Sequence, residues 1–160
     1  MLLGWCNILK REIGDCKMNT AYKTDVVAWA NEQAAFIRAG RLDLLDLENI
    51  AEEIEDVGKS EQRELSSRMA ILLAHLLKWQ FQTGRRGASW RLTIKEQRKE
   101  IFYDLKKTPS LKSLMNDTEW LEMVWGKARG VAANETGLDS FPEICPWTNE
   151  QILSQEFFPD

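Results

Sequence analysis

Residues 69–77 read MAILLAHLL, a run in which His75 is the single polar side chain. A helix that is apolar on all sides must be surrounded by other elements, so this run is expected at the centre of a helical core. The pattern around it continues from Leu47 to about Gln82 and predicts one long central helix. Near the start of this helix, a narrow apolar seam is predicted from residues that step by three or four positions: Leu47, Ile50, Ile54 and Val57.

Two features of the long helix do not fit simple apolar packing. Gly58 lies inside it, where glycine costs about 1 kcal/mol relative to alanine, and therefore marks a bend or a close helix crossing. Glu61, Arg68 and His75 recur every seven residues and form a polar column beside the apolar seam. Such residues pair across a bundle or a dimer interface, which we favour over a catalytic role.

Three shorter helices are predicted to accompany the central one, over residues 22–39, 89–107 and 111–134. Asp25 or Thr24 caps the first of them, and Gly40 follows its end. Pro109 separates the last two, because proline cannot continue a helix. Gly137 follows the end of the last helix. Short connections between such helices are typical of an up-and-down bundle.

The end of the chain, FPEICPWTNEQILSQEFFPD, is expected to form a loop-rich tail with one short helix. Thr148 and Gln151 have the spacing of a capping box at the start of that helix. No stretch alternates cleanly between apolar and polar residues, so no sheet is expected. The sequence predicts an all-α protein: an up-and-down bundle of about four main helices, with a long central helix and a loop-rich C-terminal tail. Residues 18–160 are expected to form a single helical domain, preceded by an extension over residues 1–17.

The charge of the chain is unevenly distributed, although its net value is only −4. Residues 43–64 carry nine acidic side chains against two basic ones, and residues 78–112 carry ten basic side chains against three acidic ones. Acidic and basic segments that follow one another usually complement each other within a fold. The seven tryptophans indicate a core or an interface built on large flat side chains.

Cysteine usage and hydropathy favour a cytoplasmic protein. Cys6, Cys16 and Cys145 cannot all pair and lack the spacing of metal ligands, which indicates reduced thiols. No apolar run approaches the ~20 residues that a membrane-spanning helix needs, so no membrane partner is expected.

His75 is the first candidate for chemistry, because a buried imidazole needs hydrogen-bond partners. Its helical neighbours Ile71, Leu72 and Trp79 offer no acceptor side chain, so its partner is expected from another helix. That partner is sought among acidic and amide side chains: Glu48, Glu52, Glu96, Gln97 and Glu100. The candidate polar centre consists of His75, Glu52, Trp79, Trp90 and Gln97. Either it acts as a general base or metal ligand, or His75 is a satisfied core histidine stacked on Trp79, which we favour.

Metal and cofactor chemistry find little support. Glu48, Glu52 and Glu55 share one face of a helix, but the Glu-x-x-His pairs of di-metal bundles are missing. There is no glycine-rich phosphate loop and no Ser/His/Asp or Cys/His set. We therefore predict no catalytic residue, no metal and no cofactor.

The basic segment 78–112 is the candidate for nucleic-acid binding, with a candidate basic surface of Arg85, Arg86, Arg91, Lys95 and Arg98. Aromatic side chains interleaved with cations can stack bases and hold phosphates. Trp90, however, falls on the apolar face of its helix, which favours core packing for the aromatic residues.

Several blocks of the sequence after residue 20 resemble a known family. DLENIAEEIE (46–55), LLAHLLKWQ (72–80) and SWRLTIKEQR (89–98) follow in order, and AANETGL and FPEICPWT come after them. The chain is similar in these blocks to domain-of-unknown-function family 29, a bacterial family abundant in cyanobacteria. The resemblance implies a helical bundle in a bacterial cytoplasm and carries over no catalytic residue.

These observations favour a non-enzymatic helical interaction module that self-associates, for example as a dimer, or that binds another protein. The tryptophan content, the segregated charges and the missing catalytic set motivate this hypothesis. One alternative is a nucleic-acid-associated protein that uses segment 78–112, which we do not favour. The other is an enzyme with its polar centre around His75.

Overall fold

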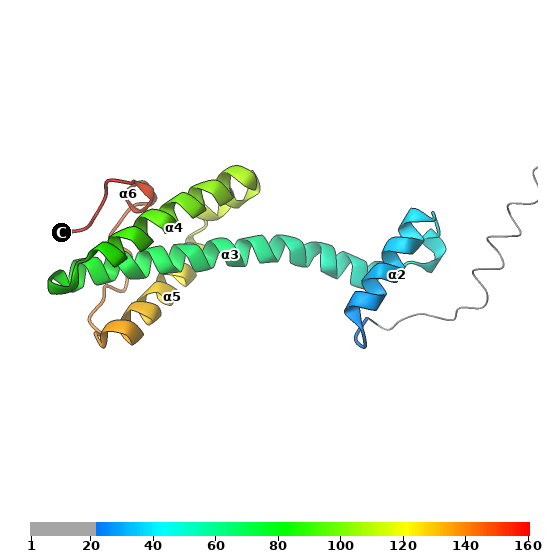
Figure 1. Ribbon diagram of the computed structural model, residues 1–160, viewed down its shortest axis with the longest axis horizontal. Coiled ribbons are helices and arrows are strands. Elements are labelled where there is room, and N and C mark those ends of the chain that lie inside the picture. Colours follow the sequence, from blue (N-terminus) through cyan, green and yellow to red (C-terminus); the bar gives the residue numbers. More distant parts are fainter. Residues whose placement is uncertain (1–21) are drawn as a thin grey trace, which may run out of the picture. The chain divides into compact units, whose positions relative to one another are not determined.

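The computed structural model describes residues 22–160, and residues 1–17 and the two cysteines at positions 6 and 16 lie outside this part. Of the described residues, 76% are helical and none is in a strand. The longest helix, α3, covers Leu47–Phe81, 35 residues (Figure 1). The all-α fold with a long central helix is therefore confirmed. The chain divides after Glu55 into two compact units, which are described separately.

The first unit contains α2 (Val26–Arg38), the 3-10 turn η1 (Leu42–Leu44) and the first turns of α3. The predicted cap of α2 is confirmed, because the Asp25 carboxylate accepts a hydrogen bond from the Ala28 amide at 2.9 Å. Gly40, two residues beyond the end of α2, has φ of 69°, a left-handed conformation that glycine adopts without strain. The chain can therefore reverse here and enter η1.

Asp46 joins α2 to the start of α3 within the first unit. Its carboxylate accepts hydrogen bonds from the Trp29 indole at 3.2 Å and from the Asn49 side chain at 2.6 Å. Its backbone amide donates to the Gln33 side chain at 2.9 Å. The hydrogen bond from the Asn49 side chain is the main reason why the pKa of Asp46 lies below its usual value. The same carboxylate accepts from the Asn49 backbone amide at 3.4 Å, so Asp46 caps the start of α3 and also fixes α2.

The second unit begins with the rest of α3, followed by η2 (Thr83–Arg85), α4 (Ala88–Lys107), η3 (Pro109–Asn116), α5 (Thr118–Thr136) and α6 (Asn149–Leu153). In Figure 1, α4 and α5 flank this part of α3, and the chain reverses direction between successive helices. The core is continuous across the three helices, with Leu72 and Leu76 of α3, Ile94 and Ile101 of α4 and Val124 of α5 completely buried. The apolar run 69–77 thus lies at the centre of the core, as predicted.

The segment predicted as one helix over 111–134 is divided into η3 and α5. Asp117 separates them, because its carboxylate accepts the Trp120 amide at 3.0 Å and so starts a new helix. Gly137 ends α5 with φ of 72°, as expected. The capping box of α6 is also confirmed, since Thr148 and Gln151 bond each other's backbone amides at 2.9 and 3.2 Å.

No helix within residues 22–160 combines the length with the apolar composition that crossing a bilayer requires.

Candidate functional site

A buried lysine lies at the polar centre of the second unit. Lys78 is only 3% exposed, and its ammonium group forms an ion pair with Glu135 of α5. The same Nζ lies 3.2 Å from Nε2 of His75 and 5.3 Å from the centre of the Trp90 ring. An anion, an acceptor nitrogen and an aromatic face therefore surround one buried cation.

His75 finds its partners on its own helix, so the expectation of a partner from another helix is wrong. Its Nδ1 lies 2.9 Å from the Ile71 carbonyl, which can only accept, so Nδ1 carries the proton. Nε2 is then free to accept from Lys78. Burial, first among the causes, lowers the pKa of His75, and the nearby Lys78 charge acts in the same direction. His75 is therefore a neutral, half-buried histidine at neutral pH.

The other members of the predicted polar centre are dispersed. Glu52 is an exposed side chain of the first unit. Trp79 packs against Phe158 of the tail, with ring centres 4.9 Å apart. Gln97 is partly buried, and its Oε1 accepts no hydrogen bond in the described part of the chain. Only Trp90 shares a partner with His75, namely Lys78.

Arg86 and Arg98 hold the C-terminal tail instead of forming a surface. Arg98 is 1% exposed and donates to the carbonyls of Ile152 and Phe157, both at 2.7 Å. Arg86 donates to the Trp79 carbonyl at 2.8 Å and to the Pro159 carbonyl at 3.5 Å. Burial lowers the pKa of Arg98 to about 10, which leaves it charged at neutral pH. The expectation that Arg98 belongs to an exposed basic surface is therefore wrong.

The remaining members of that predicted surface are exposed. Arg85 lies in η2, and Lys95 lies on α4. The Arg91 guanidinium lies 5.5 Å from the Trp79 ring centre and 5.8 Å from that of Phe158. The rings of Trp79 and Phe158 are therefore engaged by contacts within the fold. Trp90 packs against the core, as its helical position indicates.

The outer face of α4 combines exposed apolar and basic side chains, a feature that the sequence reading missed. Phe102 is 70% exposed, and Leu92 and Tyr103 are similarly accessible. The exposed lysines on this side are Lys95, Lys99 and Lys106. Positions 92, 95, 99, 102 and 106 step by three or four, which is the spacing of a single helix face. This spacing in the sequence could have indicated the face. We call these residues, with Tyr103, the α4 outer face.

The first unit also exposes many large apolar side chains. Leu47 and Ile54 of the predicted seam are 66% and 68% exposed, and Ile50 is partly buried. Val57, the last residue of the predicted seam, already belongs to the second unit and is also 68% exposed. Among its own residues, α2 buries only Trp29 and Gln33. Further apolar side chains of this unit are exposed: Val26, Val27, Ile37, Leu42 and Leu44.

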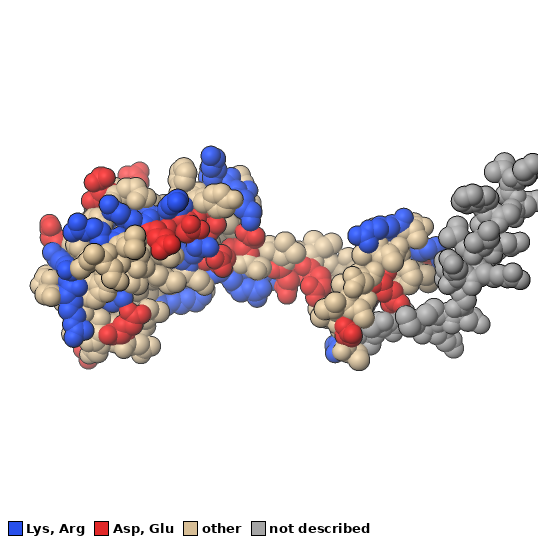
Figure 2. All heavy atoms as spheres, viewed as in Figure 1, with Lys and Arg blue, Asp and Glu red and all other residues tan. Residues whose placement is uncertain are grey.

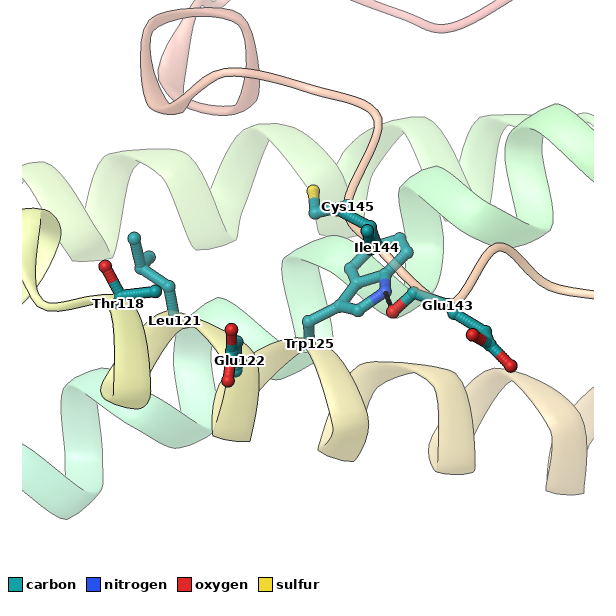
Figure 3. Close-up of a pocket in the computed structure, with 7 residues that line it drawn as sticks. All are labelled: Thr118, Leu121, Glu122, Trp125, Glu143, Ile144 and Cys145. Carbon is teal, nitrogen blue, oxygen red and sulfur yellow. Dashed lines mark hydrogen bonds between the residues drawn. The ribbon is translucent and has the colours of Figure 1, made fainter.

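A pocket of about 420 Å³ lies between α5 and the loop before α6 (Figure 3). Leu121, Trp125 and Ile144 supply its apolar wall, and Glu122 and Glu143 lie at its edge. The Trp125 indole donates to the carbonyls of Pro142 and Glu143 at 3.2 and 3.0 Å, which fixes the loop. Burial raises the pKa of the Cys145 thiol, so this thiol stays protonated and is a poor nucleophile at neutral pH.

Two members of the predicted polar column, Glu61 and Arg68, pair with α4 inside the second unit, whereas His75 has its partners on α3. Arg68 lies 2.7 Å from Glu64, 3.0 Å from Asp104 and 3.5 Å from Glu100. Glu61 lies 3.8 Å from Lys107. The pKa of Asp104 is raised, chiefly by burial, although Arg68 opposes this shift. The column therefore helps to fix the pairing of α3 with α4.

Carboxylates of the described residues form no group suited to a metal ion. No set of three or more His, Cys, Asp or Glu side chains in this part of the chain is arranged as ligands, and this includes the face of Glu48, Glu52 and Glu55.

Comparison with known proteins places the chain in a family. The family model "Domain of unknown function DUF29" matches residues 21–158, so the chain belongs to this family. No curated protein and no solved structure matches the chain significantly.

Proposed function

We propose that this member of the DUF29 family is a non-enzymatic helical interaction module that self-associates through its first unit. The observation that carries this proposal is the exposure of the apolar seam on α3, where Leu47 and Ile54 are 66% and 68% exposed. Exposed apolar side chains that recur on one helix face are typical of interaction surfaces.

The core formed by the described part of the first unit supports the same proposal. Within residues 22–55, the buried side chains are Trp29 and Gln33. Two buried side chains are a small core, so burial of the seam by a second copy would supply the missing stabilisation. Complete burial of one leucine or isoleucine contributes roughly 1.5–3 kcal/mol.

The polar centre of the second unit supports a structural role. Lys78 is paired with Glu135, and both nitrogens of His75 are engaged by Ile71 and Lys78. An enzyme with its centre at His75 remains the alternative, and it requires an imidazole nitrogen that substrate can reach. The two contacts of His75 argue against such access.

The second alternative is a nucleic-acid-associated protein that uses segment 78–112. The exposed lysines of the α4 outer face favour it. Arg86 and Arg98 weigh against it, since their guanidinium groups bind backbone carbonyls within the fold.

Sedimentation velocity over a range of protein concentrations tests the proposal. We expect wild-type protein to associate and Leu47→Gln/Ile54→Gln to sediment as a monomer with unchanged helical circular dichroism. Ile144→Gln is the matched control, because Ile144 is 83% exposed in the second unit, and it should associate like wild type. A wild type that is monomeric at every concentration would overturn the proposal, as would a double variant that associates normally.

A further inference from the structure

The pocket between α5 and the loop before α6 combines an apolar wall with acidic surroundings. Its volume of about 420 Å³ lies within the range of small-molecule sites, roughly 300–1,000 Å³. We infer that it binds a small organic amine, in which a protonated nitrogen is carried on a compact apolar body. The pocket lies entirely within the second unit, so this inference is independent of self-association through the first unit.

The apolar wall of the pocket comes from two elements that are fixed to each other. Leu121 and Trp125 lie one turn apart on α5, and Ile144 lies on the loop (Figure 3). The Trp125 indole donates to two loop carbonyls, which holds the loop against the helix. The Cys145 thiol also lines the pocket and adds no charge. An apolar body can therefore enter a space that is already formed, and its burial against Ile144, which is 83% exposed, favours binding.

Glu122 supplies the negative charge at the pocket. It is exposed and lies between Leu121 and Trp125 in Figure 3, whereas the carboxylate of Glu143 points away from the indole. No ion pair found within residues 22–160 involves Glu122. Thr118 lines the pocket one turn before Glu122 on the same side of α5. An ammonium group has three donor hydrogens and can therefore bind the Glu122 carboxylate and the Thr118 hydroxyl together.

The two segments that form the pocket carry only negative charge. Residues 117–126 and 138–146 contain no lysine or arginine and five carboxylates: Asp117, Glu119, Glu122, Asp139 and Glu143. The packing of α3 against α4 differs, because red and blue side chains lie next to one another there in Figure 2 and Arg68 pairs with Asp104. No cation is among the residues that line the pocket, since Arg129 lines a separate hollow beside Asp139. A cationic ligand would supply the counter-charge, whereas an anionic ligand would be repelled.

Ligand-detected NMR titrations of the full chain test the inference with three probes of similar shape. These are 2-phenylethylammonium, the neutral 2-phenylethanol and the anionic phenylacetate. We expect the amine to bind with a Kd on the order of 1 mM, roughly 3- to 5-fold more tightly than the alcohol, because a partly exposed ion pair contributes about this much. Phenylacetate should bind more weakly than either. The preference for the amine should largely disappear at about 1 M salt, where charges are screened within about 3 Å.

Substitutions of exposed side chains separate the charge of the pocket from its apolar wall. Glu122→Gln should abolish the preference for the amine and leave the affinity for the alcohol unchanged. Glu119→Gln is the matched control, because it removes another exposed carboxylate of α5 that does not line the pocket, and it should keep the preference. Ile144→Gln should weaken the binding of amine and alcohol by a similar factor of at least ~3, because both bury their apolar bodies against Ile144. Circular dichroism should show unchanged helix content in all three variants.

The inference fails if the amine shows no saturable binding, if amine and alcohol bind equally well, or if Glu122→Gln keeps the preference. It also fails if Ile144→Gln weakens neither probe, because the ligand then binds elsewhere on the protein. The peptide acetyl-Phe-Lys-amide carries the same chemistry, and binding of this peptide at least ~10-fold more tightly than the amine would assign the pocket to a protein partner instead. If a variant lowers the helical signal, the salt titration of wild type decides, and a preference that persists at about 1 M salt contradicts the inference.

Discussion

At the scale of single residues, His75 shows how one backbone acceptor decides which nitrogen of a neutral imidazole carries the proton. The Ile71 carbonyl, four residues earlier, accepts a hydrogen bond from Nδ1 at 2.9 Å, so Nδ1 carries the proton and Nε2 accepts from Lys78. The sequence revealed that His75 needs a partner, but a search among side chains overlooked this carbonyl. Whether the His75 ring reaches this carbonyl depends on its side-chain rotamer, which residue spacing does not determine.

The lowered pKa of His75 predicts a pH dependence of stability. The unfolded chain binds a proton at the ordinary value of 6.5, whereas the folded chain resists protonation until a lower pH. The contribution of His75 is therefore complete above 6.5 and is lost as the pH falls below it. We expect the melting temperature of wild type to drop more than that of His75→Gln between neutral pH and about pH 5.

The His75→Gln variant also tests the enzymatic alternative. Glutamine can keep one of the two hydrogen bonds, so the free energy of unfolding should fall by only about 1 kcal/mol. If the pH dependence were the same in both proteins, His75 would not be the titrating group. A stable His75→Gln protein that loses all activity in the cell would favour the enzyme.

Arg98 gives a second prediction at this scale. Arg98→Met keeps most of the side-chain volume but leaves the Ile152 and Phe157 carbonyls without their donor. We expect denaturant unfolding to show a loss of about 2 kcal/mol. Arg91→Met is the control, since Arg91 is exposed and contacts the same Phe158 ring, and it should cost under about 1 kcal/mol. Equal losses in both variants would contradict a stabilising role for the hydrogen bonds from Arg98 to the C-terminal tail.

At the scale of elements, several helix ends could be predicted from neighbouring residues in the sequence, whereas the burial or exposure of each helix face could not. The sequence indicated Asp25, Gly40, Gly137 and the capping box of Thr148 because capping needs only neighbouring residues. The α4 outer face was not predicted, and the exposure of Leu47 and Ile54 in the seam was not either, because apolar spacing does not tell which helix face another element covers. Arg98 was misassigned for the same reason.

Gly58 gives a prediction for α3. A Cβ added at this position would meet nothing within 4 Å, so Gly58→Ala adds no clash in the chain as described. Because alanine is the better helix former, thermal unfolding should show a gain of up to about 1 kcal/mol. A lower stability, or the loss of association in the alanine variant, would instead indicate that a second helix crosses closely at Gly58.

At the scale of the whole molecule, the two units differ in how much core they possess. The second unit contains the continuous core around Leu72 and Leu76, whereas the first unit buries Trp29 and Gln33 among residues 22–55. The expectation of a single domain over residues 18–160 was based on the length of the chain. Periodicity reports that a helix continues, but it does not report where its contacts with other elements begin.

This difference leads to the measurement that tests the central claim most directly. Hydrogen exchange of backbone amides, followed by mass spectrometry at low and high protein concentration, reports the stability of each unit separately. If a second copy stabilises the first unit, protection of residues 26–55 should increase with concentration by mass action, while residues 65–79 stay equally protected. The Leu47→Gln/Ile54→Gln variant should lose this concentration dependence. Protection of residues 26–55 that is the same at every concentration in wild-type protein would contradict the account.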